Sequence, residues 1–189
     1  MNRIRKSLVA ISLGFATLVL FTCQQMPLEP AEQSPAMALQ GYRPAPVNPE
    51  IVGLAKTVGT DTEYIHKEFG GIVGGNDTGG NFVLIPPNTL AKDGYIYLAI
   101  DTVDDPADPL YGALVFDVST STNENSVVKE HIALQEGTTC RLYVKKNWFS
   151  TPPTSVMTTD GDEVVTGITE YEGYWMIEVT HFSQWAWTW

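Results

Sequence analysis

The sequence predicts an all-β protein, a single antiparallel β-sandwich of seven or eight strands that follows a signal peptide and a disordered proline-rich tether. Three observations support this class. Apolar and polar residues alternate with a period of two from about Glu63 onward, turn residues separate the alternating segments, and no segment between them has a helical period. The predicted parts are residues 1–22, 23–62 and 63–189, for the leader, the tether and the sandwich.

The leader combines a basic start with an apolar run. Positive charges lie at Arg3, Arg5 and Lys6, the apolar run extends from Ser7 to Phe21, and Cys23 follows. The run is too short for a comfortable transmembrane helix, which needs about 20 residues.

These residues resemble a bacterial lipoprotein signal, in which the cysteine is acylated and becomes the N-terminus. The resemblance implies lipidation of Cys23 and an extracytoplasmic, lipid-anchored protein. Gln24 stands where an Asp would signal inner-membrane retention, so the outer membrane of a Gram-negative bacterium is favoured. The alternatives are a plain transmembrane anchor and a secretory peptide cleaved elsewhere.

Proline-rich sequence follows the leader. Prolines are frequent from Gln24 to Glu50 and large aliphatic residues are sparse. Such a segment buries too little apolar area to compensate for the entropy lost on ordering, which predicts an extended, disordered tether. Residues 49–62 leave two interpretations open. Asn48-Pro49-Glu50 could cap a short helix through Ile51, Leu54 and Val58, although two glycines weaken it, or the segment could belong to the tether.

The strands of the sandwich are predicted from the alternation and its boundaries. Pro86-Pro87-Asn88 stops one strand firmly, and glycine-rich residues 70–80 are interpreted as a turn between strands rather than a phosphate loop. The predicted strands are 82–85, 95–100, 113–118, 140–145, 162–169, 174–182 and the end of the chain around Trp185, Trp187 and Trp189.

Charge and cysteine content limit the function. The chain has a formal net charge of −11, and removal of the three positive charges of the leader leaves −14. So acidic a chain argues against nucleic-acid binding. With Cys23 acylated, Cys140 has no cysteine to pair with, and its place among alternating apolar residues predicts a buried, unreactive thiol.

Three segments together carry a family resemblance. They are Phe69–Gly74, the strand and Ile-Pro-Pro sequence of Phe82–Leu90, and the His-Phe-Ser sequence within Val179–Trp187. In this order they resemble the β-sandwich domain shared by ankyrins, netrin receptors and zonula-occludens scaffolds, which also occurs in bacterial surface lipoproteins. The resemblance implies a non-enzymatic interaction or spacer module, and it implies no particular ligand.

The tripeptide His181-Phe182-Ser183 is the sharpest candidate for chemistry, because it looks like a self-cleaving site in a subset of that family. In that reaction the Ser183 hydroxyl attacks the Phe182 carbonyl, His181 assists proton transfer, and the peptide bond must be strained. The competing interpretation is structural. His181 shares a face with Trp175, Ile177 and Val179, which predicts a buried histidine bonded to the backbone.

Two further groups of residues are candidates for binding. Asp101, Asp104, Asp105 and Asp108 could hold Ca²⁺ through carboxylate oxygens, although solvated surface charge is favoured. Tyr95 and Tyr97 lie opposite the apolar face of their strand and could stack on carbohydrate or protein.

These features predict a membrane-anchored lipoprotein that presents a non-enzymatic β-sandwich for binding or structural spacing at the cell envelope, with no cofactor and no catalytic residue. Its expected partners are the membrane, through the lipid anchor, and an envelope protein or glycan. The alternatives are a sandwich that cleaves itself between Phe182 and Ser183, and a carbohydrate-binding or hydrolytic envelope protein.

Overall fold

A computed structural model describes residues 41–189, except residues 53–56 and 124–130. The predicted leader, Cys23 and the predicted tether as far as residue 40 therefore lie outside the described residues. Within the described part of the chain, no helix is long and apolar enough to cross a membrane.

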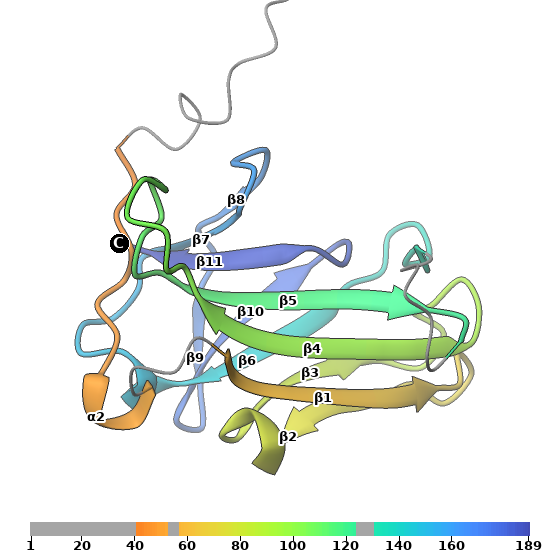
Figure 1. The fold of residues 1–189 in the computed structure, drawn as a ribbon. Coiled ribbons are helices and arrows are strands. Elements are labelled where there is room, and N and C mark those ends of the chain that lie inside the picture. The colour runs from red at the N-terminus through yellow and green to blue at the C-terminus, as the bar shows by residue number, and fades with distance from the viewer. Residues whose placement is uncertain (1–40, 53–56, 124–130) are drawn as a thin grey trace, which may run out of the picture. The chain divides into compact units, whose positions relative to one another are not determined.

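The described residues form two antiparallel sheets that pack face to face as a β-sandwich (Figure 1). The six-stranded sheet has the order β1-β4-β5-β11-β7-β8, and the five-stranded sheet has the order β2-β3-β6-β10-β9. In the first sheet the strands are β1 (Thr57–Ile65), β4 (Gly94–Thr102), β5 (Leu114–Ser121), β7 (Ser155–Thr158), β8 (Val164–Val165) and β11 (Gln184–Thr188). In the second they are β2 (Gly71–Gly75), β3 (Asn81–Ile85), β6 (Cys140–Lys145), β9 (Thr169–Tyr171) and β10 (Tyr174–Val179).

The predicted fold class is confirmed, but the described strands outnumber the seven or eight expected. β7 was missed because all its side chains are buried, so its sequence does not alternate. The strand predicted over 162–169 is wrong. Val164–Val165 pairs with β7 in one sheet, whereas Thr169 begins β9 in the other, so the chain crosses between sheets within that segment.

The ordered fold begins earlier than the predicted boundary at residue 63. Strand β1 starts at Thr57, after a single helical turn, α2 (Pro49–Val52), whose Glu50 N–H donates to the side chain of Asn48 over 3.1 Å. Residues 43–48 also join the sandwich. The Ala45 N–H donates to the Trp187 carbonyl over 2.9 Å, which continues the sheet along the part of β11 that β5 does not reach.

The prolines of this segment explain why it was predicted as tether. Pro44 and Pro46 have no N–H to donate, but they flank Ala45, whose N–H makes the bond to Trp187. Ala45 is itself buried in the main core. A segment with proline at every second residue can therefore still pair with a strand, because the residue between the prolines has an N–H. Its proline-rich composition alone had predicted disorder.

The core lies between the two sheets and is rich in large side chains. Trp185, Trp187 and Phe116 are fully buried there, and burial of each large apolar side chain contributes about 1.5–3 kcal/mol. Cys140 belongs to the same core, and burial raises the pKa of its thiol from 9.0 to about 12. The prediction that this thiol is buried is confirmed.

One corner of the sandwich is closed by a contact between the two sheets. The Asp61 carboxylate on β1 accepts a hydrogen bond of 2.6 Å from the Gly74 N–H on β2. Gly74 has a φ of +106°, and a Cβ there would overlap the carbonyl oxygen of Asn81 and the Leu98 side chain. Glycine at this position lets the edge of the second sheet approach the first.

The opposite end of the six-stranded sheet is covered by the loop between β4 and β5. Leu110 and Ala113 of this loop pack against Val115, Met157 and Ala186 in a second, smaller apolar cluster. This cluster lies on the outer face of the sheet, away from the main core. It leaves the middle of the outer face uncovered.

Candidate functional site

The outer face of the six-stranded sheet carries a row of aromatic and polar side chains. Strand β4 alternates between buried and partly exposed residues, so Tyr95, Tyr97, Ala99 and Asp101 point outward. The register places Tyr97 opposite Ser119 and Ala99 opposite Asp117 on β5. The aromatic half and the polar half of this face are therefore neighbours.

Two adjoining cavities hollow the polar half of this face. Their volumes are about 320 and 360 Å³, and both are lined by Asp117, Thr159 and Gln184. We refer to the two together as the outer groove. Its other lining residues are Val118, Ser119, Thr120, His131, Asp160, Phe182 and Ser183 in one cavity, and Asp101, Thr102, Val103, Asp108 and Val115 in the other.

A chain of side-chain hydrogen bonds crosses the groove where the two cavities meet. The Thr159 hydroxyl donates to the Gln184 side-chain oxygen over 3.1 Å, and the Gln184 amide nitrogen donates to Asp117 Oδ2 over 3.1 Å. Three adjacent strands, β5, β11 and the end of β7, thus contribute to one polar array. Carboxylate, amide and hydroxyl groups in such an array supply both donors and acceptors for a bound ligand.

The groove is acidic. Its ionisable lining residues are four aspartates (Asp101, Asp108, Asp117 and Asp160) and His131, with no lysine or arginine among the described residues that line it. Hydrogen bonds from Thr158 and from the Asp162 N–H lower the pKa of Asp160 below its ordinary value, so this carboxylate remains ionised under mildly acidic conditions.

Exposed aromatic rings gather at the other end of the same face. Tyr64 on β1 is 43% exposed and lies edge-to-face against Tyr95, with ring centroids 4.9 Å apart. The Tyr64 ring also contacts His66, which in turn contacts Phe69, a side chain that is 74% exposed. His66 is paired with Asp93 over 3.3 Å. The prediction that Tyr95 and Tyr97 face away from the core is confirmed, although both are half-buried.

The tripeptide His181-Phe182-Ser183 is divided between different environments. Phe182 and Ser183 line the outer groove, and Phe182 is otherwise buried in the core. His181 is paired with Glu163 over 3.3 Å, and its ring lies against Trp185. Within the described residues no hydrogen bond joins His181 to Ser183.

The expectation of a buried His181 is wrong, because its side chain is 38% exposed and bonded to a carboxylate. Strand β10 ends at Val179, so the alternation that would have turned His181 inward stops two residues before it. Neither Phe182 nor Ser183 has a positive φ. The Ser183 carbonyl is held by the Val118 N–H over 3.0 Å. The described residues therefore show neither a His181–Ser183 hydrogen bond nor a positive φ at the bond that self-cleavage would break.

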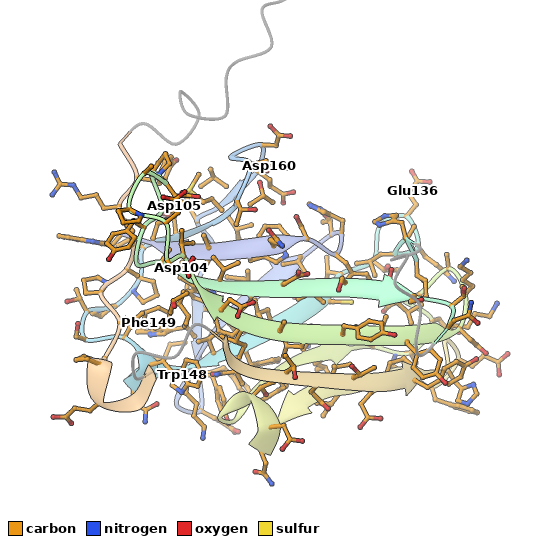
Figure 2. All side chains as sticks on the ribbon, viewed as in Figure 1. Asp104, Asp105, Glu136, Trp148, Phe149 and Asp160 are labelled. Atoms are coloured by element: carbon orange, nitrogen blue, oxygen red, sulfur yellow. The ribbon has the colours of Figure 1, made fainter. Side chains whose placement is uncertain are left out.

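The four aspartates proposed as calcium ligands do not converge. Asp105 and Asp108 bond to the backbone N–H groups of Ala107 and Leu110 within their own loop, where they stabilise its turns. In Figure 2, Asp104 and Asp105 lie in the loop between β4 and β5, and Asp160 lies on the turn between β7 and β8. Among the residues that the structure describes, no group of three or more His, Cys, Asp or Glu side chains is arranged to hold a metal ion.

A second aromatic group on the outside of the five-stranded sheet was not identified from the sequence. Phe82 stacks on Tyr143 at a centroid distance of 4.6 Å, and Tyr171 and Tyr174 lie edge-to-face against Tyr143. The alternation of β3, β6 and β10 could have indicated this group. The pairing of these strands across the sheet, which brings the rings together, cannot be derived from the sequence.

The outer groove was also missed. Its residues come from six separate segments, and few of them had been singled out from the sequence as candidates for binding or chemistry. Comparisons with protein-family models, with curated proteins and with solved structures give no match for this chain. The resemblance to the domain of ankyrins, netrin receptors and zonula-occludens scaffolds therefore stays a prediction.

Proposed function

We propose that the protein is a lipid-anchored, extracytoplasmic binding module that recognises a glycan through the outer face of its six-stranded sheet. The observation that carries the proposal is the register of β4 and β5, which places Tyr97 directly beside the polar outer groove. Sugars present apolar C–H faces and polar hydroxyl edges, so a site for them combines aromatic rings with hydrogen-bonding side chains.

The polar side of this site is held in place by the fold. Asp117 and Gln184 are cross-strand partners on β5 and β11, and their side chains are joined by a hydrogen bond. Thr159 fixes the orientation of the Gln184 amide. Because these groups sit on sheet strands and not on long loops, little conformational entropy is lost when they bind a ligand.

The aromatic side is also restrained. The Tyr97 hydroxyl donates to the Asn123 carbonyl over 3.2 Å, which holds the ring along the face next to Ser119. A sugar in the groove would extend over this ring. We favour a binding function over a hydrolytic one because the groove is an open depression on a sheet, and its carboxylates also serve the fold through bonds such as those of Asp108 and Asp160.

The proposal is tested by measuring binding to an array of bacterial-envelope and plant polysaccharides, followed by calorimetry on the strongest ligand. Tyr97→Ala should weaken binding about tenfold, since loss of an aromatic contact costs on the order of 1 kcal/mol. Tyr97→Phe keeps the ring and should bind within about twofold of the wild type.

The matched control is Tyr171→Ala, which removes an exposed aromatic ring from the outside of the other sheet. This variant should bind glycan as the wild type does. Failure of every polysaccharide on the array to bind, or equal losses in Tyr97→Ala and Tyr171→Ala, would refute the proposed function.

A further inference from the structure

Five aromatic side chains form a row that leads from the outer groove to the turn between β1 and β2, and we refer to them as the aromatic row. In order from the groove they are Tyr97, Tyr95, Tyr64, His66 and Phe69. Tyr97 and Tyr95 lie two residues apart on the outward side of β4, so their Cα atoms are about 7 Å apart. Tyr64 is the cross-strand partner of Tyr95 on β1. From Tyr95 onward each ring contacts the next, with centroid distances of 4.9, 5.0 and 6.1 Å.

Phe69, at the far end of the aromatic row, is the most exposed large apolar side chain in the described part of the protein, at 74%. Its ring lies edge-to-face against His66 and is not part of the buried core. A single exposed apolar residue is ordinary, whereas a run of exposed rings in contact is typical of a surface that binds another molecule. Folding alone therefore does not explain an aromatic residue at this position.

The turn that carries Phe69 is fixed by hydrogen bonds. The Phe69 and Gly70 N–H groups both donate to the His66 carbonyl, over 3.0 and 2.9 Å. One oxygen of Asp93 accepts from the Lys67 N–H over 2.9 Å, and the other pairs with His66 over 3.3 Å. Because these bonds hold the end of the aromatic row in place, little conformational entropy is lost when a ligand binds there.

The row is continuous with the outer groove, and the two together match one kind of ligand. The groove offers hydrogen-bonding side chains such as Gln184 and Thr159, and the row offers aromatic rings. A sugar chain uses both, because each pyranose ring has C–H faces and hydroxyl edges. An apolar peptide would match the rings but leave the polar array of the groove without partners.

The length of this path restricts the ligand further. The outward-facing residues of β4 from Asp101 to Tyr95 span about 20 Å, which is several times the length of one sugar ring. A monosaccharide or disaccharide therefore covers only part of the path. A chain of several sugars reaches from the groove, over Tyr97, to Tyr64 and Phe69.

We infer that the ligand is an extended polysaccharide chain and that Tyr64 and Phe69 form a second subsite for it at the corner of the sandwich. The inference rests on the proposed function, because the same chain must also occupy the groove and contact Tyr97. The second subsite determines the specificity for chain length. It adds affinity only when the ligand is long enough to reach it.

The test measures how affinity depends on the length of the ligand. Calorimetry on the chain carrying Cys23→Ser compares oligosaccharides, from disaccharides to decasaccharides, prepared from the polysaccharide that binds most strongly on the array. The affinity should rise about tenfold between the shortest ligands that bind and those that reach Phe69, and it should then stay constant with further length.

Variants of Phe69 locate the effect. Phe69→Ala removes an exposed ring and should weaken binding of the longest oligosaccharides about threefold to tenfold, while binding of the shortest ones stays unchanged. Phe69→Tyr keeps an aromatic ring and should bind ligands of every length as the wild type does. The matched control is Tyr171→Ala, which removes a ring that is 50% exposed on the outside of the other sheet and should change neither affinity.

The contrary outcomes separate this inference from the proposed function. Equal affinities for short and long ligands, or a Phe69→Ala variant that binds long ligands as the wild type does, would overturn the inference, and the proposed function would stand if Tyr97→Ala still weakens binding. Equal losses for short and long ligands in Phe69→Ala would mean that Phe69 acts through the fold, which also overturns the inference. If no polysaccharide binds, both fail.

Discussion

At the scale of single residues, burial controls the chemistry of the cysteine that remains after the leader. Cys140 is fully enclosed by the core between the two sheets. A thiolate there would be a charge without a partner, which is why burial raises the pKa of the thiol to about 12. The thiolate is the form of cysteine that reacts with alkylating agents, so the native fold should protect this residue from modification.

The first prediction concerns this protection. In a chain carrying Cys23→Ser, Cys140 is the remaining cysteine. Iodoacetamide at a pH of about 8 should leave the folded protein unmodified and alkylate it rapidly in urea, as followed by intact-protein mass spectrometry. Alkylation of the native protein at the rate of the unfolded chain would show that the thiol is accessible.

The same pKa shift has a consequence for stability in alkali. The folded thiol keeps its proton to a higher pH than the unfolded thiol, so the folded state binds more protons above the ordinary thiol pKa of 9.0. The free energy of unfolding should therefore fall as the pH rises from about 9 towards 12. Cys140→Ala should lack this part of the slope in urea titrations, and an identical slope in both proteins would contradict the assignment.

At the scale of elements, the hairpin of β2 and β3 depends on glycine and on a small polar network. Asn81 is fully buried, donates to the Thr78 carbonyl over 2.8 Å, and accepts from the Lys145 N–H over 2.8 Å. The hairpin is thereby fixed to β6. On its other edge, Gly74 bonds to Asp61 and brings the two sheets together.

The second prediction separates the two reasons for glycine at this edge. Gly74→Ala should destabilise the protein by about 2–4 kcal/mol, because it adds overlap with the Asn81 carbonyl to the cost of a positive φ. Gly137→Ala, at φ +76° with open space around its Cβ, should lose about 1–2 kcal/mol, for the φ alone. Equal losses in urea titrations would mean that the close approach of the sheets contributes nothing.

Strand periodicity explains how far the sequence could predict these elements. The strand over 140–145 is confirmed with those bounds, and the strand over 82–85 is confirmed except that it begins one residue earlier, at Asn81. Both end at prolines or at a turn. β1 and β2 were missed, because an edge strand with Gly59 and a strand of sequence Gly-Ile-Val-Gly-Gly lack that alternation. The groove could not be predicted, because it depends on the pairing of β11 between β5 and β7.

At the scale of the whole molecule, the sequence places the expected lipid anchor and the proposed glycan site in different parts of the chain. The lipid anchor is expected at Cys23, whereas the proposed glycan site lies on the outer face of β4, β5 and β11.

The third prediction follows from the leader. Mass spectrometry of the membrane fraction should find Cys23 as the acylated N-terminus, and Cys23→Ser should shift the protein out of that fraction. An unmodified Cys23 with the leader attached would refute lipidation.

The proposed glycan binding requires that the outer face of the six-stranded sheet is the ligand surface. The most direct measurement is an NMR titration of the chain carrying Cys23→Ser, using as the ligand an oligosaccharide of the polysaccharide that binds most strongly on the array. We predict that backbone shifts change around Tyr97, Ser119, Asp117 and Gln184, and that they do not change around Tyr143 and Tyr171 on the other sheet. Shift changes confined to the five-stranded sheet, or none at saturating ligand, would contradict it.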